Sequence, residues 1–347
     1  MFDKNNFEAP LDIFISNALY HPKKGYYMKN IPFGKSGDYI TAPNISKIFS
    51  EMIFLWIISY WEKFFKNKKI NIIELGAGNG EMMHQIITSS KNFGNFHNNC
   101  HFKIYEKSEK LIKVQKKRLI GHKIKWLKNL ENLENKPTIF LGNEFLDALP
   151  IKQFFKYNNK WFEKFVKKEG GIYSFSKKNC DIKRIEKKLN FKISKNQKFL
   201  EISFDAINII KKLNNIITSK GGCLLFIDYA YSKNQMIDTL QAIKNHKKIS
   251  PLEDVGSADI SYLINIPFLK KISKIINLKL DHNTQREFLL KMGILKRAEI
   301  LSANKSFLEK ANIFYRVERL INKKQMGELF KVMCFYKKNK RLKLGFK

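Results

Sequence analysis

Residues 71–83 read NIIELGAGNGEMM, an apolar run that leads into three glycines at alternate positions. The run has the composition of a buried strand, and a helical pattern begins with Glu81, directly after the last glycine. Gly76, Gly78 and Gly80 permit a tight turn in which the backbone can approach a ligand closely. In open α/β sheets, ligands bind at the carboxyl ends of the strands, where such turns occur.

The chain repeats this pattern of strand and helix after the glycine turn. Apolar runs occupy residues 101–106, 137–145, 221–231 and 330–336, and helical patterns lie near residues 109–119, 206–217 and 285–293. Strands that are apolar throughout and alternate with helices indicate a parallel sheet covered on both faces. The sequence therefore predicts an α/β protein with a mostly parallel sheet.

A strong helix is predicted before the glycine turn. Asn44 is expected to cap it, and one face should be buried in the core, because apolar side chains recur there at helical spacing: Ile45, Ile48, Phe49, Met52, Ile53 and Trp56. The preceding residues 25–43, GYYMKNIPFGKSGDYITAP, are rich in Gly, Pro, Ser and Asp and predict a loop.

Residues 151 to about 200 follow a different pattern. Apolar and polar residues alternate there, and the pairs Asn158-Asn159 and Gly170-Gly171 mark turns, so antiparallel hairpins are expected. We therefore divide the chain into an N-terminal cap with a covering loop at 1–65, a core at 66–150 and 200–347, and an antiparallel insertion at 151–199.

The composition is that of a globular protein, since 44% of the 347 residues are hydrophobic and 13% are aromatic. The formal net charge of +34 would suit a nucleic-acid partner. The lysines, however, are scattered in short runs through nearly every segment, which indicates a compositional bias and a solvated basic surface. Nucleic acid is therefore not the expected partner.

The cysteines and the apolar segments indicate where the protein resides. Cys100, Cys180, Cys223 and Cys334 form no C-x-x-C pair, which predicts no metal site and indicates a reducing compartment. Cys223 and Cys334 lie in apolar runs and should be buried. The N-terminus has no apolar secretory segment, and the most apolar window, residues 48–61, is too short to span a membrane. We expect a cytoplasmic protein.

The glycine turn is compatible with three interpretations: a dinucleotide pyrophosphate, the amino-acid end of S-adenosylmethionine, or a purely structural turn. The dinucleotide fingerprint is G-x-G-x-x-G, whereas this turn is G-x-G-x-G. Glu74, two residues before Gly76, would repel a pyrophosphate but attract an α-ammonium group. Glu106 ends the next strand, where an acid can accept hydrogen bonds from ribose hydroxyls. The two acids favour S-adenosylmethionine.

The following strand ends in a polar cluster, Asn143, Glu144 and Asp147. Such a cluster has no cofactor role in a dehydrogenase but is useful beside a transferable methyl group. Methyl transfer requires alignment of nucleophile, methyl group and sulfur rather than a metal, so no metal ligands are expected.

Four stretches together resemble the MidA family of S-adenosylmethionine-dependent methyltransferases: GYYMKNIPFGKSGDYITAPNIS, IELGAGNG, YEKSEKLIKVQ and GNEFLDALPIKQF. The likeness continues in order through LLFIDYAY, VGSADIS, REFLLKMGI and QMGELFKVM, over nearly the whole chain. The resemblance implies a class I, Rossmann-like methyltransferase sheet with an inserted smaller domain. It also implies methylation of an arginine in a protein substrate, a core subunit of respiratory complex I, during assembly.

The resemblance assigns roles to the residues that match. Gly76, Gly78, Gly80 and Glu106 would bind the cofactor, Asn143, Glu144 and Asp147 would lie at the methyl-transfer face, and residues 34–43 would form the covering loop. Three positions depart from the family pattern, since Ala77 and Asn79 replace a proline and an arginine of the turn and Ala230 replaces a glycine.

Carboxylates would help if the nucleophile is an arginine guanidinium. Two of them can hold its planar fork through paired hydrogen bonds and localise lone-pair density on the attacking nitrogen. We expect Glu144 in this role first, and Asp147 and Asp228 next. Asp38, in the covering loop, is expected to contact the cofactor or gate the site, although a turn-forming aspartate is the commoner case.

Two other classes of function remain open. An RNA methyltransferase would use the basic surface, but residues 142–150, GNEFLDALP, lack the Asn/Asp-Pro-Pro-aromatic motif of enzymes that methylate amino groups of bases. A non-catalytic assembly chaperone could keep the methyltransferase fold without the chemistry, and the altered turn at Ala77 and Asn79 leaves this alternative open.

Overall fold

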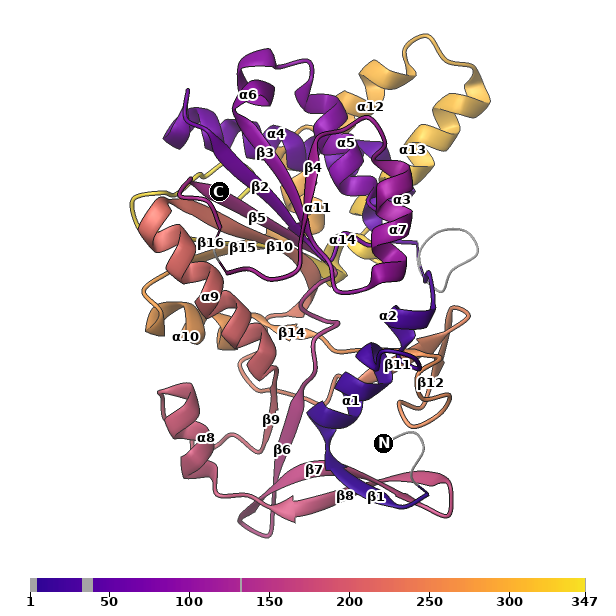
Figure 1. Ribbon diagram of the computed structural model, residues 1–347, viewed down its shortest axis with the longest axis vertical. Coiled ribbons are helices and arrows are strands. Elements are labelled where there is room, and N and C mark those ends of the chain that lie inside the picture. The colour runs from indigo at the N-terminus through magenta and orange to yellow at the C-terminus, as the bar shows by residue number, and fades with distance from the viewer. Residues whose placement is uncertain (1–4, 33–39, 132, 347) are drawn as a thin grey trace. The chain divides into compact units, whose positions relative to one another are not determined.

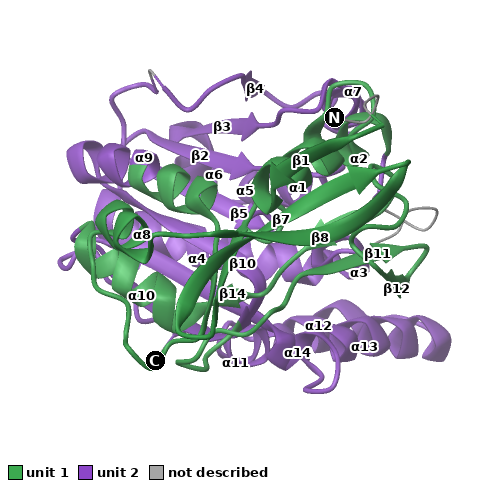
Figure 2. Cartoon of the chain, turned by 90° about the horizontal axis from the view of Figure 1, so that it is seen from below, with its two compact units in different colours: residues 1–30, 146–211, 231–276 green, residues 31–145, 212–230, 277–347 purple. Residues whose placement is uncertain are grey.

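The computed structural model describes residues 5–32, 40–131 and 133–346 (Figure 1). Contacts divide the chain into two compact units, each built from three separate segments (Figure 2). Unit 1 comprises residues 1–30, 146–211 and 231–276, and unit 2 comprises residues 31–145, 212–230 and 277–347. The predicted domain boundaries near residues 65, 150 and 200 stay a prediction, since compactness alone does not define parts that fold independently.

Unit 2 contains a mixed, mostly parallel sheet with the strand order β15-β16-β10-β5-β2-β3-β4. These strands are β2 (Ile70–Leu75), β3 (Cys100–Tyr105), β4 (Ile124–Leu127), β5 (Thr138–Asn143), β10 (Gly222–Tyr231), β15 (Lys279–Thr284) and β16 (Phe330–Tyr336). Strands β4, β3, β2, β5 and β10 run parallel, whereas β16 is antiparallel to both β10 and β15. The predicted α/β class is therefore confirmed.

Strand β2 lies at the centre of this arrangement, and all of its residues are buried. It pairs with β3 on one side and with β5 on the other. Helices α4 (Lys47–Phe65) and α5 (Glu81–Ser90) bury their apolar side chains in one core together with alternate strand residues such as Ile70 and Ile72. The remaining helices with residues in unit 2 are α3 (Ala42–Ile45), α6 (Gly94–Asn99), α7 (Glu109–Arg118), α9 (Phe204–Lys220), α11 (Gln285–Lys291), α12 (Ile294–Ser302), α13 (Phe307–Ile321) and α14 (Met326–Leu329).

The helix predicted before the glycine turn is confirmed as α4, and the six apolar side chains assigned to its buried face are at most 3% exposed. One of the six, Ile45, belongs to α3 and not to α4. The N-cap of α4, however, is Ser46 and not Asn44, because the Ser46 hydroxyl accepts a hydrogen bond from the Ile48 N–H at 3.3 Å. The chain is extended at Ser46, which separates α4 from the short helix α3. Asn44 belongs to α3, and its amide donates to the Thr41 hydroxyl at 2.8 Å.

Unit 1 contains an antiparallel sheet with the strand order β1-β7-β6-β9. A fifth strand, β8, pairs with β7. Its strands are β1 (Phe7–Pro10), β6 (Lys152–Tyr157), β7 (Lys160–Glu169), β8 (Ile172–Asn179) and β9 (Phe199–Ile202). The predicted hairpins are present at Asn158-Asn159 and at Gly170-Gly171. All four turn residues have positive φ, as a two-residue type I′ turn requires.

Several elements were not predicted from the sequence. In unit 1 these are α1 (Leu11–Tyr20), α2 (Tyr26–Lys29), α8 (Ile182–Leu189), α10 (Ile266–Ile275), β14 (Ile264–Asn265) and a small sheet of β11 (Gln241–Lys244), β12 (Lys247–Ile249) and β13 (Asp259–Ser261). In unit 2 they include α12, α13 and the polar edge strand β15.

Two further expectations concern the cysteines and membrane segments. Cys223 and Cys334 are buried, as predicted, in β10 and β16. Among the described residues, no helix combines the length and the apolar character that crossing a membrane requires.

Gly222 offers a test of the close packing of β10 against β5. It has a φ of +124°, and a Cβ there would lie 1.8 Å from the carbonyl oxygen of Thr138. Because this oxygen belongs to the backbone of a buried strand, we expect Gly222→Ala to lower the free energy of unfolding by more than about 2 kcal/mol in urea denaturation.

Gly94→Ala is the matched control, because a Cβ at that helical glycine would meet no atom within 4 Å. Its stability should stay within about 1 kcal/mol of the wild type. Equal stabilities of the two variants would contradict the close approach of β10 and β5.

Candidate active site

The glycine turn connects β2 to α5 at the carboxyl end of the central strand. Gly76, Gly78 and Gly80 have φ angles of 64°, 52° and 81°, a region that residues other than glycine rarely adopt. The Gly76 N–H donates to the Tyr105 carbonyl of β3 at 2.9 Å, and the Gly80 N–H donates to the Ala77 carbonyl at 2.7 Å. The backbone path of the turn therefore requires the glycines, and β3 holds it in place.

A small pocket within unit 2 is lined by this turn and by predicted site residues from two strand ends. Its wall includes Glu74 from β2, the glycine turn, and Asn143 and Glu144 from the end of β5. Residues Thr41, Pro43 and Asn44, which precede α4, complete the lining with Glu81 and Met82 of α5. The structure thus brings together three of the polar residues predicted from separate motifs.

Glu74 is the buried acid of this pocket and is 3% exposed. Its carboxyl group accepts a hydrogen bond from the Met83 backbone. The second oxygen, Oε2, has no hydrogen-bond partner in the described part of the chain. Burial, together with the nearby Glu106, raises the pKa of Glu74 to about 8. A cation at Oε2 would stabilise the ionised carboxylate, because it would replace the lost hydration.

Glu106 follows β3 and lies beside the turn. Its Oε1 accepts hydrogen bonds from the backbone N–H groups of Lys107 at 2.8 Å and Ser108 at 3.0 Å. Its Oε2 accepts a hydrogen bond from the Gln115 amide at 3.2 Å. Burial raises the pKa of Glu106, and these hydrogen bonds oppose that rise. The carboxylate is therefore held in one orientation.

Gln115, on α7, is a residue that the sequence did not indicate. It is fully buried, and the Nε2 amide that bonds Glu106 also donates to the Gly78 carbonyl at 2.9 Å. Its Oε1 accepts from the Trp126 indole N–H at 2.9 Å. Gln115 thus ties the glycine turn, Glu106 and β4 together. The available signal was a polar residue four positions after Leu111, on the buried face of the helix.

Asn143 is the last residue of β5, and Glu144 follows it directly. Glu144 has a φ of 52°, which costs a residue other than glycine about 1 kcal/mol or more. Its N–H donates to the Ile227 carbonyl of β10 at 2.9 Å. The Asn143 amide donates to Glu144 Oε1 at 3.1 Å, and Asn143 Oδ1 is buried with no partner among the described residues. Two side chains with acceptor oxygens therefore line the same pocket.

Asp228 lies on β10 and is completely buried. Its Oδ2 accepts a hydrogen bond from the Phe145 N–H at 3.2 Å, and its Oδ1 accepts one from the Tyr229 N–H at 2.9 Å. It is not among the residues that line the pocket. Asp228 therefore holds the chain directly after Glu144.

Of the two other acids that were predicted for the site, one belongs to unit 1 and the other lies outside the described residues. Asp147 belongs to unit 1, where it is 7% exposed, and it does not line the pocket of unit 2. Asp38 lies outside the described residues, as do residues 34–39 of the predicted covering loop.

Asn79, where the family pattern has an arginine, has defined partners. Its Oδ1 accepts from the Glu81 N–H at 3.2 Å at the start of α5, and its amide donates to Asn44 Oδ1 at 2.8 Å. Asn44 and Asn79 thus link the segment before α4 to the glycine turn. The sequence marked both residues but predicted neither contact.

Residues 52–283 match the model of a family of S-adenosyl-L-methionine-dependent methyltransferases, Methyltransf_28. Because this match covers more than half of the chain, the protein belongs to that family. The predicted enzyme class and the predicted cofactor, S-adenosylmethionine, are therefore confirmed.

The chain is similar along most of its length to curated proteins named protein arginine methyltransferase NDUFAF7, mitochondrial. It is 28% identical to the Xenopus tropicalis protein, over 92% of this chain and 80% of that one. It is 27% identical to the human protein, over 91% of this chain and 77% of that one.

A solved structure shares the fold. It is the crystal structure of a COG1565 superfamily member from Burkholderia thailandensis bound to S-adenosyl-homocysteine, with a TM-score of 0.81 and 22% sequence identity. The match covers 98% of this chain and 89% of that one. The predicted class I methyltransferase fold is confirmed.

The cluster around Gln115 can be tested by a change in stability. Gln115→Leu would leave the Gly78 carbonyl and the Trp126 indole without their buried partner, so we expect the free energy of unfolding to fall by about 1–3 kcal/mol in urea denaturation. Lys113→Leu, at an exposed position of the same helix, should change it by less than about 0.5 kcal/mol. A Gln115 variant as stable as this control would rule out the linking role.

Proposed function

We propose that this enzyme transfers the methyl group of S-adenosylmethionine to a guanidinium nitrogen of an arginine in a protein substrate. The observation that carries the proposal is the end of β5, where Glu144 and the unpartnered Asn143 Oδ1 line one pocket. A guanidinium has five N–H donors and no acceptor, so it suits a site that offers carboxylate and amide oxygens. The names of the NDUFAF7 relatives support an arginine target.

The residues around the glycine turn fit the cofactor. Glu74 would bind its α-ammonium group, the backbone of Gly76, Gly78 and Gly80 would lie along the methionyl part, and Glu106 would bind the ribose hydroxyls. The buried and unpartnered Oε2 of Glu74 supports this placement, because a cationic group bound there would stabilise the ionised carboxylate that burial disfavours. S-adenosylmethionine supplies an electrophilic methyl group on a sulfonium when bound.

Glu144 would act on the arginine. Its carboxylate would hold the guanidinium through charge-assisted hydrogen bonds and would keep positive charge away from the attacking nitrogen. As the bond from that nitrogen to the methyl carbon forms, the methyl–sulfur bond would break and S-adenosylhomocysteine would leave. The nitrogen would give up a proton, and Glu144 is the acceptor we propose. Asp228 would act indirectly, by fixing the chain after Glu144 through the Phe145 N–H.

The remaining predicted roles stay proposals. We propose Asp147 as a second ligand of the guanidinium group. We propose that Asp38 contacts the cofactor or gates the site. From the family resemblance we propose a respiratory complex I subunit as the partner. Cytoplasmic residence stays a prediction.

Of the two rival functions, the non-catalytic chaperone is the one that the pocket opposes. A scaffold that binds no cofactor would gain stability by replacing Glu74, because a buried carboxyl group with an unpartnered oxygen is costly. No feature of the described pocket favours RNA.

The role of Glu144 can be separated from cofactor binding. We expect Glu144→Gln to lower methylarginine formation at least about a hundredfold, since it removes the charge on the substrate side. The dissociation constant for S-adenosylmethionine should change less than threefold. The assay follows tritiated methyl groups from the cofactor into proteins of an extract that lacks the enzyme, with methylarginine identified after hydrolysis.

Glu131→Gln is the control, because this carboxylate is exposed and pairs with Lys212. It should retain full activity. A Glu144 variant that binds the cofactor poorly yet transfers at the normal rate at saturation would refute the assignment.

Binding of the cofactor should depend on pH through Glu74. With a pKa of about 8, this carboxyl group is protonated at neutral pH before the cofactor binds, whereas an α-ammonium group requires the carboxylate. Binding therefore releases a proton, and affinity should rise on the order of tenfold from pH 6 to pH 7.5. Calorimetry in buffers of different ionisation enthalpy measures the released proton. Glu74→Gln should bind more weakly with no such dependence, and the same proton release in that variant would exclude Glu74 as its source.

A further inference from the structure

Unit 1 contains a pocket of about 440 Å³ that the proposed reaction does not use. Three segments of this unit form it: residues 189–200 between α8 and β9, residues 234–236 after β10, and residues 265–271 at the start of α10. A cavity of this size holds one or two large side chains or a small ligand.

The floor of the pocket is apolar. Leu189, Leu200 and Met236 are at most 5% exposed and belong to one hydrophobic cluster. The rings of Phe191 and Phe268 meet edge to face on its wall, with centroids 6.0 Å apart. An apolar or aromatic group would be removed from water there.

Hydrogen bonds join two of the three segments and hold the third in its own conformation. The Asn265 amide donates to the Lys233 carbonyl at 3.0 Å, and its Oδ1 accepts from the Phe268 N–H at 2.8 Å. On the other wall, the Ile193 N–H donates to the Glu186 carboxylate at 2.8 Å. The pocket is therefore formed before any ligand enters, which reduces the entropy lost on binding.

The rim is polar, and its only ionisable lining side chain is a cation. Four amide side chains, of Asn196, Gln197, Asn234 and Gln235, stand with Lys271 around the apolar floor, and no carboxylate lines the pocket. Amide side chains can bond both the N–H and the C=O of an extended peptide. The described structure shows no ion pair at Lys271, whose ammonium lies 5.7 Å from the Phe191 ring centroid. The rim thus favours a peptide that carries a carboxylate.

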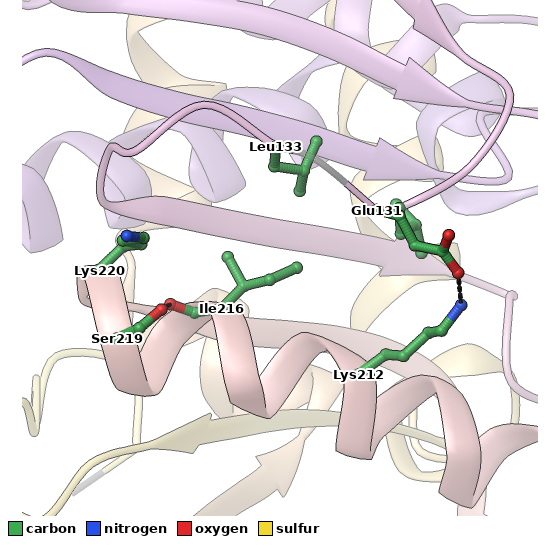
Figure 3. Close-up of a pocket in the computed structure, with 7 residues that line it drawn as sticks. Glu131, Leu133, Lys212, Ile216, Ser219 and Lys220 are labelled. Atoms are coloured by element: carbon green, nitrogen blue, oxygen red, sulfur yellow. Dashed lines mark hydrogen bonds and ion pairs between the residues drawn. The ribbon is translucent and has the colours of Figure 1, made fainter.

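The groove of about 300 Å³ in unit 2, between α9 and the side chains of Leu130, Glu131 and Leu133, differs in this respect (Figure 3). There Glu131 and Lys212 pair at 2.6 Å, so the two charges at that end neutralise each other. Lys220 also lines that groove, so its lining holds one carboxylate and two lysines. The unit 1 pocket differs because it combines an apolar floor with the ammonium of Lys271 and has no carboxylate in its lining, which favours an anionic partner.

We propose that the unit 1 pocket binds an acidic segment of the protein substrate, with one bulky apolar side chain on its floor and a neighbouring carboxylate on Lys271. The inference rests on the proposed function, since it assigns the pocket to the polypeptide that is methylated. It also accounts for how a chain of net charge +34 holds a partner whose arginine it would otherwise repel.

The test measures binding of a fluorescein-labelled peptide, GDEFDEG, to the full chain by fluorescence anisotropy. Lys271→Glu should weaken binding at least tenfold. Lys274→Glu is the matched control, because it makes the same change of charge at an exposed position of α10 outside the pocket, and it should weaken binding less than twofold. The peptides GDEADEG and GKKFKKG, which lack the apolar side chain or the acids, should also bind at least tenfold more weakly.

Equal effects of the two lysine substitutions would mean that only overall charge attracts the peptide, and would overturn the proposal. Equal affinity for GDEFDEG and GDEADEG, or no binding of any peptide, would overturn it as well. Binding of phenylacetate in place of the peptide would identify a small-molecule pocket instead. An unchanged circular dichroism spectrum and an unchanged urea-unfolding midpoint show that the variants are folded. Because the peptide assay involves no methyl transfer, its result is independent of the arginine assay.

Discussion

A carboxyl group buried at the end of the central strand is the constraint on which the site depends. Strand β2 is enclosed by β3, β5 and the helices, so Glu74 enters the interior with the strand that carries it. The glycine turn follows at once and leaves no side chain that could neutralise it. The site therefore has a buried carboxyl group whose ionised form needs a cation, next to a backbone that leaves room for a ligand.

The other parts of the site follow from the same geometry. Parallel strands end at one edge of the sheet, so acids that are far apart in the sequence meet there. Glu106 after β3 and Glu144 after β5 flank Glu74 for this reason. Gln115 and Asp228 then fix the flanking chain by hydrogen bonds to backbone and side-chain groups. In our proposal, Glu74, Glu106 and Glu144 contact the ligands. Gln115 and Asp228 orient these residues and the chain that carries them.

Local patterns in the sequence predicted most of the sheet and part of the site. The buried strands, helix α4 and the Asn-Asn and Gly-Gly hairpins were predicted. Buried strands require apolar residues, and these turns require residues that tolerate positive φ, so both are visible in the sequence. The N-cap of α4 was misplaced, since Asn44 and Ser46 are equally good caps and only the tertiary contacts choose between them. The role of Gln115 was not predicted, because its three hydrogen-bond partners lie on separate elements. No pattern of residue spacing in the sequence indicates these contacts.

The order of the strands has a consequence for synthesis of the chain. Strand β16, residues 330–336, inserts between β10 and β15 and pairs with one backbone edge of the buried strand β10. During translation that edge stays open for about a hundred residues after β10 has left the ribosome, a time in which unpaired strands can join with other chains. Unit 2 can close its sheet only when nearly the entire chain has emerged. A strand made near the end of synthesis therefore protects a strand made about a hundred residues earlier.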